Sequence, residues 1–89
     1  MNDPNVLNPV TVSIAAVERD TGLSKDTLRV WERRYGFPQP ERDAYGERVY
    51  PLEQLDKLRL VKRLMDQGFR PGKVIGQSSV ELQKLAEGV

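Results

Sequence analysis

Apolar residues near the start of the chain recur at helical spacing and predict a first short helix. Ser13 has a side chain that can cap a helix, and the helix is expected over about residues 14–20. Ile14 and Val17 would then face inward. Gly22 is expected to end the helix, because glycine readily adopts the left-handed conformation found after helix C-termini.

A second helix is predicted to follow after a turn of only about four residues. Ser24 can cap it, and it is expected to continue through residues 25–35 until Gly36 ends it. Arg29 and Arg33 lie one helical turn apart and therefore share a face. Another face is apolar and is expected to pack on the core; it is formed by Leu28, Trp31 and Tyr35. Two helices joined by a tight turn that contains glycine indicate a helix-turn-helix motif.

Residues 36–50 interrupt the helical pattern and predict a β-hairpin. The prolines that follow the second helix prevent it from continuing. Short strands are expected at residues 41–42 and 48–50, with Gly46 in the connection at a position that favours positive φ. A hairpin placed directly after a helix-turn-helix is typical of the wing of a winged-helix domain.

Leucines at helical spacing predict a third, longer helix over residues 51–68. Pro71 is expected to begin a short fourth helix, which Gly76 ends. Ser79 can cap a last segment that has no obvious partner within the domain and carries an apolar stripe formed by Val80, Leu82 and Leu85. The predicted fold is therefore mainly α, a winged helix-turn-helix with a short two-stranded wing and additional C-terminal helices.

The pattern divides the chain into three parts. Residues 1–12 are rich in Asn and Pro and are predicted to be a flexible leader with one short extended segment at residues 10–12. Residues 13–78 are expected to form the folded domain. A chain of 89 residues is long enough for one small domain only. Residues 79–89 are interpreted as the beginning of a linker or a dimerisation helix.

The composition narrows the chemistry. The chain contains no Cys and no His, which excludes disulfides, thiol chemistry and metal sites built on thiolate or imidazole. The commonest general base is also absent, so we expect no enzyme, no metal and no cofactor in this chain. A net charge of +1 does not by itself identify a partner. No apolar run is long enough to cross a membrane and no signal peptide is recognisable, so we expect a cytoplasmic protein without a membrane partner.

Three motifs in fixed order resemble the N-terminal domain of MerR-type bacterial transcription regulators. They are TGLSKDTLRVWERRYG at residues 21–36, PQPER at residues 38–42 and GERVY at residues 46–50. The resemblance extends from residue 13 to residue 71. The sequence WERRYG at residues 31–36 resembles the corresponding motif in the branch whose members often carry a C-terminal cobalamin-binding domain. Cobalamin would belong to that further domain and not to this chain.

The resemblance implies a winged helix-turn-helix domain that binds double-stranded promoter or operator DNA. Its second helix would enter the major groove, and its wing would flank the adjacent minor groove or backbone. It further implies a homodimer in the full-length protein, acting on the nucleoid in the bacterial cytoplasm. Family members continue into a long dimerising helix or an effector domain, so we expect this chain to be the DNA-binding domain of a longer regulator.

The candidate DNA-binding residues lie on the second helix and in the wing. Ser24 and the backbone N–H groups at that helix N-terminus suit a phosphate. Lys25, Thr27 and Arg29 stand in the first turns, where side chains reach base edges, and an arginine can bind the O6 and N7 atoms of guanine. Arg33 comes later and suits the phosphate backbone or an intramolecular pair. The resemblance implies contacts to phosphate or sugar from three wing residues, Arg42, Tyr45 and Arg48.

Structural roles are the alternative for several side chains. Arg29 can pair with Glu18 or Glu32 instead of a base. Trp31 is expected in the core rather than on a stacking surface, and Tyr50 is expected to close the wing against the third helix. The third helix carries basic residues that we interpret as a solvated face: Lys57, Arg59, Lys62 and Arg63.

Two other functions stay open at this point. The first is an architectural protein that resembles phage excisionases and bends DNA, which cooperative tandem binding without a palindrome would indicate. The second is a protein-interaction module that uses the winged helix to hold an acidic partner. Binding to an acidic protein without affinity for DNA would indicate that module.

Overall fold

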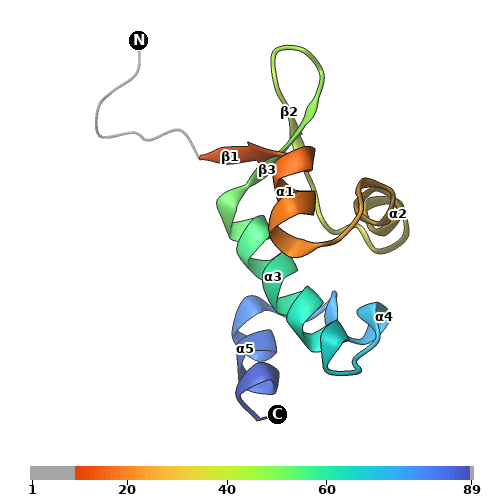
Figure 1. Cartoon of the computed structure of the whole chain (residues 1–89), viewed down its shortest axis with the longest axis vertical. Helices are drawn as coiled ribbons and strands as arrows, with labels where there is room; N and C mark the ends of the chain where they lie inside the picture. Colours follow the sequence, from red (N-terminus) through yellow and green to blue (C-terminus); the bar gives the residue numbers. More distant parts are fainter. Residues whose placement is uncertain (1–9, 89) are drawn as a thin grey trace.

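The computed structural model describes residues 10–88, which form a small three-stranded sheet together with five helices (Figure 1). This arrangement confirms the predicted mainly helical winged helix-turn-helix. The wing lies at one end of the molecule and the last helix at the other (Figure 1). In chain order the elements are β1 (Thr11–Ser13), α1 (Ile14–Thr21), α2 (Lys25–Tyr35), β2 (Glu41–Arg42), β3 (Arg48–Pro51), α3 (Leu52–Asp66), α4 (Pro71–Val74) and α5 (Ser79–Glu87).

The two helices of the helix-turn-helix begin where the capping residues predict. The Ser13 hydroxyl oxygen accepts a hydrogen bond from the Ala16 N–H at 3.1 Å. The Ser24 hydroxyl oxygen accepts one from the Thr27 N–H at 3.0 Å. Gly36 has a φ of 71° just after α2, which is the left-handed conformation that favours glycine. The bounds of α2 therefore follow from local chemistry alone.

Thr21 fixes the turn between α1 and α2. Its hydroxyl donates to the Val17 carbonyl oxygen at 2.8 Å and accepts from the Leu23 N–H at 3.0 Å. Gly22, between these partners, has a φ of 78°. Both Thr21 and Leu23 are buried, so the turn is held from inside as well as by its own hydrogen bonds. A turn fixed in this way sets the angle at which α2 leaves α1.

The sheet contains one strand more than the predicted two-stranded wing. β3 lies in the middle and pairs antiparallel with β2 on one side and β1 on the other. Thr11 of β1 lies opposite Pro51, and beyond the strands the Leu52 N–H donates to the Val10 carbonyl oxygen at 3.2 Å. The prediction of a two-stranded wing was therefore incomplete, because a segment as short as residues 10–12 has no alternating pattern that would indicate its pairing with β3.

The third strand also changes the domain boundary predicted at residue 12. β1 crosses that boundary, so residues 10–12 take part in the fold. Residues 1–9, the remainder of the predicted leader, lie outside the described residues.

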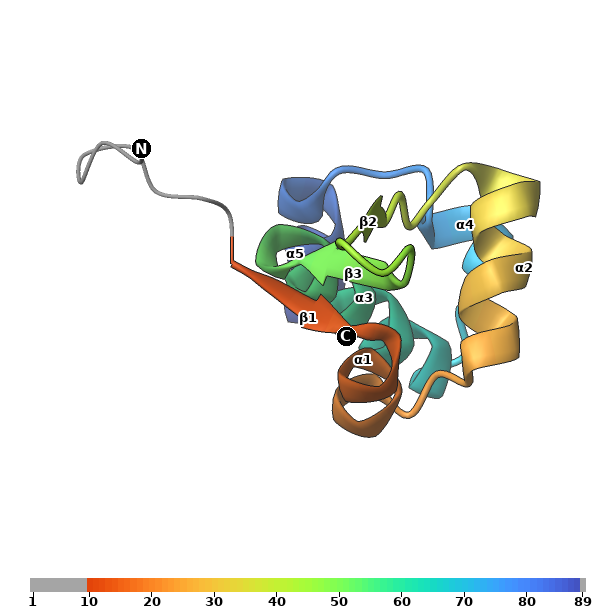
Figure 2. The same ribbon diagram turned by 90° about the horizontal axis from the view of Figure 1, so that it is seen from above.

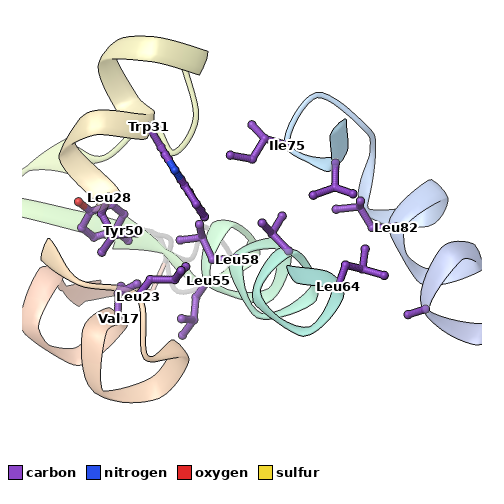
Figure 3. Close-up of a cluster of buried hydrophobic side chains, with 13 residues drawn as sticks. Val17, Leu23, Leu28, Trp31, Tyr50, Leu55, Leu58, Leu64, Ile75 and Leu82 are labelled. Carbon is purple, nitrogen blue, oxygen red and sulfur yellow. The ribbon is translucent and has the colours of Figure 1, made fainter. Parts of the chain in front are cut away.

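The core is organised around α3, which runs through the middle of the molecule (Figure 1). Side chains from α1, α2 and β3 converge on it (Figure 3). Trp31 is 5% exposed and Tyr50 is fully buried, which confirms the core position predicted for Trp31. The buried residues of α3 are Leu55, Leu58, Val61 and Leu64.

α5 packs against α3, contrary to the expectation of an exposed apolar stripe without a partner. Leu82 is fully buried and Ala86 is 7% exposed, whereas Val80 is 61% exposed. Leu64 of α3 and Leu82 lie close together in the same core (Figure 3). The apolar residues of α3 extend around more than one face, and α5 covers the face that α1 and α2 leave open. The predicted role of residues 79–89 as the beginning of a linker stays a prediction.

The start of α5 also differs from the prediction by one residue. Ser78, not Ser79, is the N-cap, and its hydroxyl oxygen accepts from the Glu81 N–H at 3.2 Å. The Glu81 carboxylate accepts in return from the Ser78 N–H at 2.8 Å. This capping box holds the pKa of Glu81 below its ordinary value. Two adjacent serines offer two caps, and the glutamate three residues later selects the first.

Candidate nucleic-acid interface

The outer face of α2 is the candidate site, and we call it the α2 face. It contains Asp26, Arg29 and Arg33, which follow one another at intervals of about one helical turn, and Val30 beside Arg29; all four are exposed. The opposite side of the helix buries Leu28. Figure 2 shows α2 along the outside of the molecule, with no described segment beyond it. A straight exposed helix face of this kind fits the dimensions of a DNA major groove.

Arg33 is available on the α2 face, because it forms no ion pair with any of the described residues. Arg29 lies 3.6 Å from the Asp26 carboxylate, and Asp26 is almost fully exposed. The partner of Arg29 is therefore Asp26, and not Glu18 or Glu32, the residues considered in the structural alternative. A solvent-exposed pair of this kind is weak, about 0.2–1 kcal/mol, so the guanidinium remains able to bind a stronger acceptor.

The N-terminal end of α2 brings Ser24, Lys25 and Thr27 together, but much of its hydrogen-bonding capacity is already engaged. The Ser24 hydroxyl caps the helix and also donates to the Thr27 hydroxyl oxygen at 2.9 Å. The Lys25 N–H donates to the Glu18 carboxylate at 3.2 Å. A carboxylate beside the first helical N–H competes with a phosphate for the same place. The ammonium group of Lys25 forms no ion pair within the described part of the chain.

The tip of the wing is an ordered turn. One carboxylate oxygen of Asp43 accepts from the N–H groups of Tyr45 and Glu47, at 2.8 and 3.0 Å. The Arg42 guanidinium donates to the Gly46 carbonyl oxygen at 3.0 Å and has no carboxylate partner among residues 10–88. Tyr45 is 89% exposed. The wing therefore carries an exposed aromatic ring and an exposed guanidinium that crosses the turn.

Arg48 connects the wing to α2. Its Nε donates to the Glu32 carboxylate at 3.0 Å, and both side chains are about three-quarters buried. The predicted contact of Arg48 with a phosphate stays a prediction, while the ion pair gives this arginine a structural contact that the sequence did not indicate. β3 places Arg48 and Tyr50 on the same side of the sheet. Burial raises the pKa of the Tyr50 hydroxyl, which has no hydrogen-bond partner among the described residues.

Sequence reasoning missed two basic residues, Arg70 and Lys73, that the fold brings toward α2. The Tyr35 hydroxyl oxygen lies 3.4 Å from the point that a Cβ atom would occupy at Gly72, so α4 packs against the end of α2. Figure 2 shows α4 beside α2. Arg70 and Lys73 flank this contact and are exposed. The pair Pro71-Gly72 could have indicated this contact, because proline begins a helix there and glycine has no side chain to keep Tyr35 away.

Other kinds of site find no support in the structure. Between residues 10 and 88 there is no group of three or more acidic, His or Cys side chains that could hold a metal ion. Within the same residues, none of the helices combines the length and the apolar character required to cross a membrane. The candidate site is therefore formed by the exposed arginines of the α2 face together with the wing.

Residues 12–76 match the family described as MerR HTH family regulatory protein. This chain belongs to the MerR family. The matched range contains both helices of the helix-turn-helix, the wing, α3 and α4. The match thus confirms the family resemblance carried by the motifs around Trp31 and in the wing.

Similar curated proteins are regulators of transcription by name. The HTH-type transcriptional repressor CarA of Myxococcus xanthus is 40% identical over 74 residues, which cover 81% of this chain and 26% of CarA. The HTH-type transcriptional regulator MlrA of Escherichia coli is 37% identical over 60 residues, covering 64% of this chain and 25% of MlrA. The mercuric resistance operon regulatory protein of Bacillus cereus is 40% identical over 48 residues, 54% of this chain and 36% of that protein. The chain thus spans about a quarter to a third of these relatives.

Proposed function

We propose that this domain binds double-stranded promoter or operator DNA through the α2 face and the wing. The observation that carries the proposal is the α2 face itself, where Arg29 and Arg33 are exposed and Arg33 has no ion pair with the described residues. In a helix-turn-helix the second helix enters the major groove. Membership of the MerR family supports the same role for α2.

The surroundings of each side chain suggest its role in binding DNA. Arg29 and Arg33 bind base edges, since a guanidinium can donate two parallel hydrogen bonds to the O6 and N7 atoms of guanine. Arg42 and Tyr45 contact the DNA backbone from the wing, where both side chains are exposed. Residues that hold the helix in place or lie at its rim contribute position and phosphate contacts: Ser24, Lys25, Thr27, Arg48, Arg70 and Lys73.

The domain further acts as part of a dimeric regulator. A two-fold dimer binds two half-sites of a pseudo-palindrome, so one chain makes only half of the contacts. The proposal places the full-length protein on the nucleoid in the bacterial cytoplasm, with residues 79–89 beginning the connection to a dimerisation or effector region. The relatives CarA and MlrA, of which this chain matches about a quarter, are consistent with such an arrangement.

Fluorescence anisotropy tests the proposal with duplexes selected from a random pool and with unselected duplexes. The wild-type chain is compared with Arg33→Ala on the α2 face and with Arg63→Ala on α3, which is also exposed but lies on a different helix. We expect Arg33→Ala to lower the affinity for selected duplexes by about 5- to 150-fold, corresponding to about 1–3 kcal/mol. Arg63→Ala is expected to leave that affinity unchanged.

Salt dependence and dimerisation complete the experiment. The logarithm of the binding constant is expected to fall by about 0.9 per logarithm of salt for each phosphate contacted, and Arg42→Ala should reduce this slope by about one such contact. A version of the chain fused to a dimerising coiled coil provides a second copy of the domain for the second half-site of the DNA. Absence of binding at low salt, even by the fused dimer, would overturn the proposed function.

A further inference from the structure

Val30 is the apolar side chain of the α2 face and lies at one edge of it, next to Arg29 in the chain. It is 41% exposed, and its neighbours on this face are Arg29, Arg33 and Asp26. Valine is a weaker helix former than alanine or lysine, because its branched side chain loses rotamer freedom in a helix. The core does not use Val30, which is absent from the buried cluster and from the residues packed against it. Neither local propensity nor packing within residues 10–88 explains a valine here.

The position of Val30 relative to the arginines suits a specific base contact. Val30 follows Arg29 directly and precedes Arg33 by about one helical turn, so its two methyl groups are exposed on the same outer side of α2 as both arginines. In the major groove the base edges offer hydrogen-bonding atoms and one apolar group, the C5-methyl of thymine. An exposed valine can gain free energy in the groove only by covering such an apolar group.

We propose that Val30 reads the C5-methyl group of a thymine next to the base pair bound by Arg29 or Arg33. The inference rests on the proposed function, because it requires the α2 face to enter the major groove. It assigns a sequence preference to a residue that has no hydrogen-bonding side chain. The domain would thereby distinguish a thymine from a cytosine at one position of each half-site.

The test removes the methyl group from the DNA instead of from the protein. Each thymine of a selected duplex is replaced in turn by uracil, which keeps every hydrogen-bonding atom and lacks only the C5-methyl. The wild-type chain is expected to bind about fourfold more weakly at one thymine per half-site, the effect of one buried methyl group. Val30→Ala is expected to bind the parent duplex about as weakly and to show no further loss with uracil at that position.

The control variant is Val80→Ala, which also truncates an exposed valine, but on α5. It is expected to keep the full sensitivity to uracil. Alanine favours the helix more than valine does, so Val30→Ala should remain folded, and circular dichroism checks this. Comparison of the three chains then separates a base contact from a general effect on the domain.

The outcomes separate this inference from the proposed function. If no duplex is selected and nothing binds at low salt, the proposed function fails. If a duplex binds tightly but no uracil substitution weakens it, or if Val30→Ala remains equally sensitive to uracil, the methyl contact is overturned while the proposed function stands.

Discussion

α2 and α3 each carry four basic residues, yet the two helices use them differently. On α3, the Arg59 guanidinium binds the Asp20 carboxylate at 2.6 and 2.8 Å and Asp56 at 2.8 Å. The Lys62 ammonium lies 2.7 Å from the Asp66 carboxylate. On α2, the tightest carboxylate contact of the exposed face is the 3.6 Å approach of Arg29 to Asp26.

The difference shows that the number of cations does not identify a phosphate-binding helix. Lys57 of α3 is directed to the Phe37 ring, with its ammonium 4.4 Å from the ring centre, and burial lowers the pKa of this lysine. Arg59 thus connects α3 to α1, Lys57 connects it to the segment after α2, and Lys62 pairs within α3 itself. The basic residues of the α2 face point away from the protein, which leaves them for a partner that lies outside the fold.

The largest expected effect tests whether α3 is also held by α5, on the side away from α1 and α2. Leu82→Ala removes a fully buried side chain between α5 and α3 and should lower the free energy of unfolding by about 2–5 kcal/mol. Urea unfolding monitored by circular dichroism measures it, with Val80→Ala as the exposed control, expected within about 0.5 kcal/mol of wild type. A cost for Leu82→Ala as small as that of the control would mean that α5 is not part of the folded unit.

A smaller effect is expected when a cation is released from its carboxylate near α2, compared with the same change on α3. Glu32→Gln removes the charge that holds Arg48 but keeps a hydrogen-bonding group of the same length. We expect the affinity for unselected duplexes at low salt to rise about threefold, because the interface loses one negative charge. Asp66→Asn on α3 similarly releases Lys62 and should leave the affinity unchanged. Equal increases in both variants, measured by anisotropy, would contradict the assignment of DNA contacts to α2.

The smallest expected effect concerns the pairing that occupies Arg59. The Arg59 guanidinium holds the pKa of Asp20 below its ordinary value of 3.8. The carboxylate is therefore harder to protonate in the folded chain, so its contribution is complete above about pH 5 and is lost as the pH falls through the lowered pKa. Urea midpoints between pH 2 and 6 should show Asp20→Asn less stable than wild type near pH 6 and equal to it at the acid end. A constant difference over this range would show that the ion pair does not link folding to protonation.

Local chemistry made most helix ends and the turn predictable. Ser13 and Ser24 cap helices with their own hydroxyl oxygens, and Gly22 and Gly36 end them with positive φ. Each of these interactions joins residues at most four positions apart, so the sequence contains both partners side by side. The same holds for Trp31, whose spacing from Leu28 already directs it inward.

The candidate site was predictable only as a set of residue types on known elements. The sequence placed Arg29 and Arg33 on one helix face, and the structure confirms that both are exposed there. It did not indicate that Arg48 would bind Glu32, sixteen positions away, because that pair depends on how the fold places β3 relative to α2. The proximity of Gly72 to Tyr35 is equally dependent on the fold.

The sequence by itself therefore determined the helix-turn-helix, the wing hairpin and the exposed face of α2. Only the tertiary structure decided that β1 adds a third strand to the sheet, that α5 covers α3, and that the basic residues of α3 are largely engaged within the protein. The physical reason is the range of the interactions. Caps and turns join neighbours in the chain, whereas strand pairing, helix packing and ion pairs between elements require the angles that the whole fold sets.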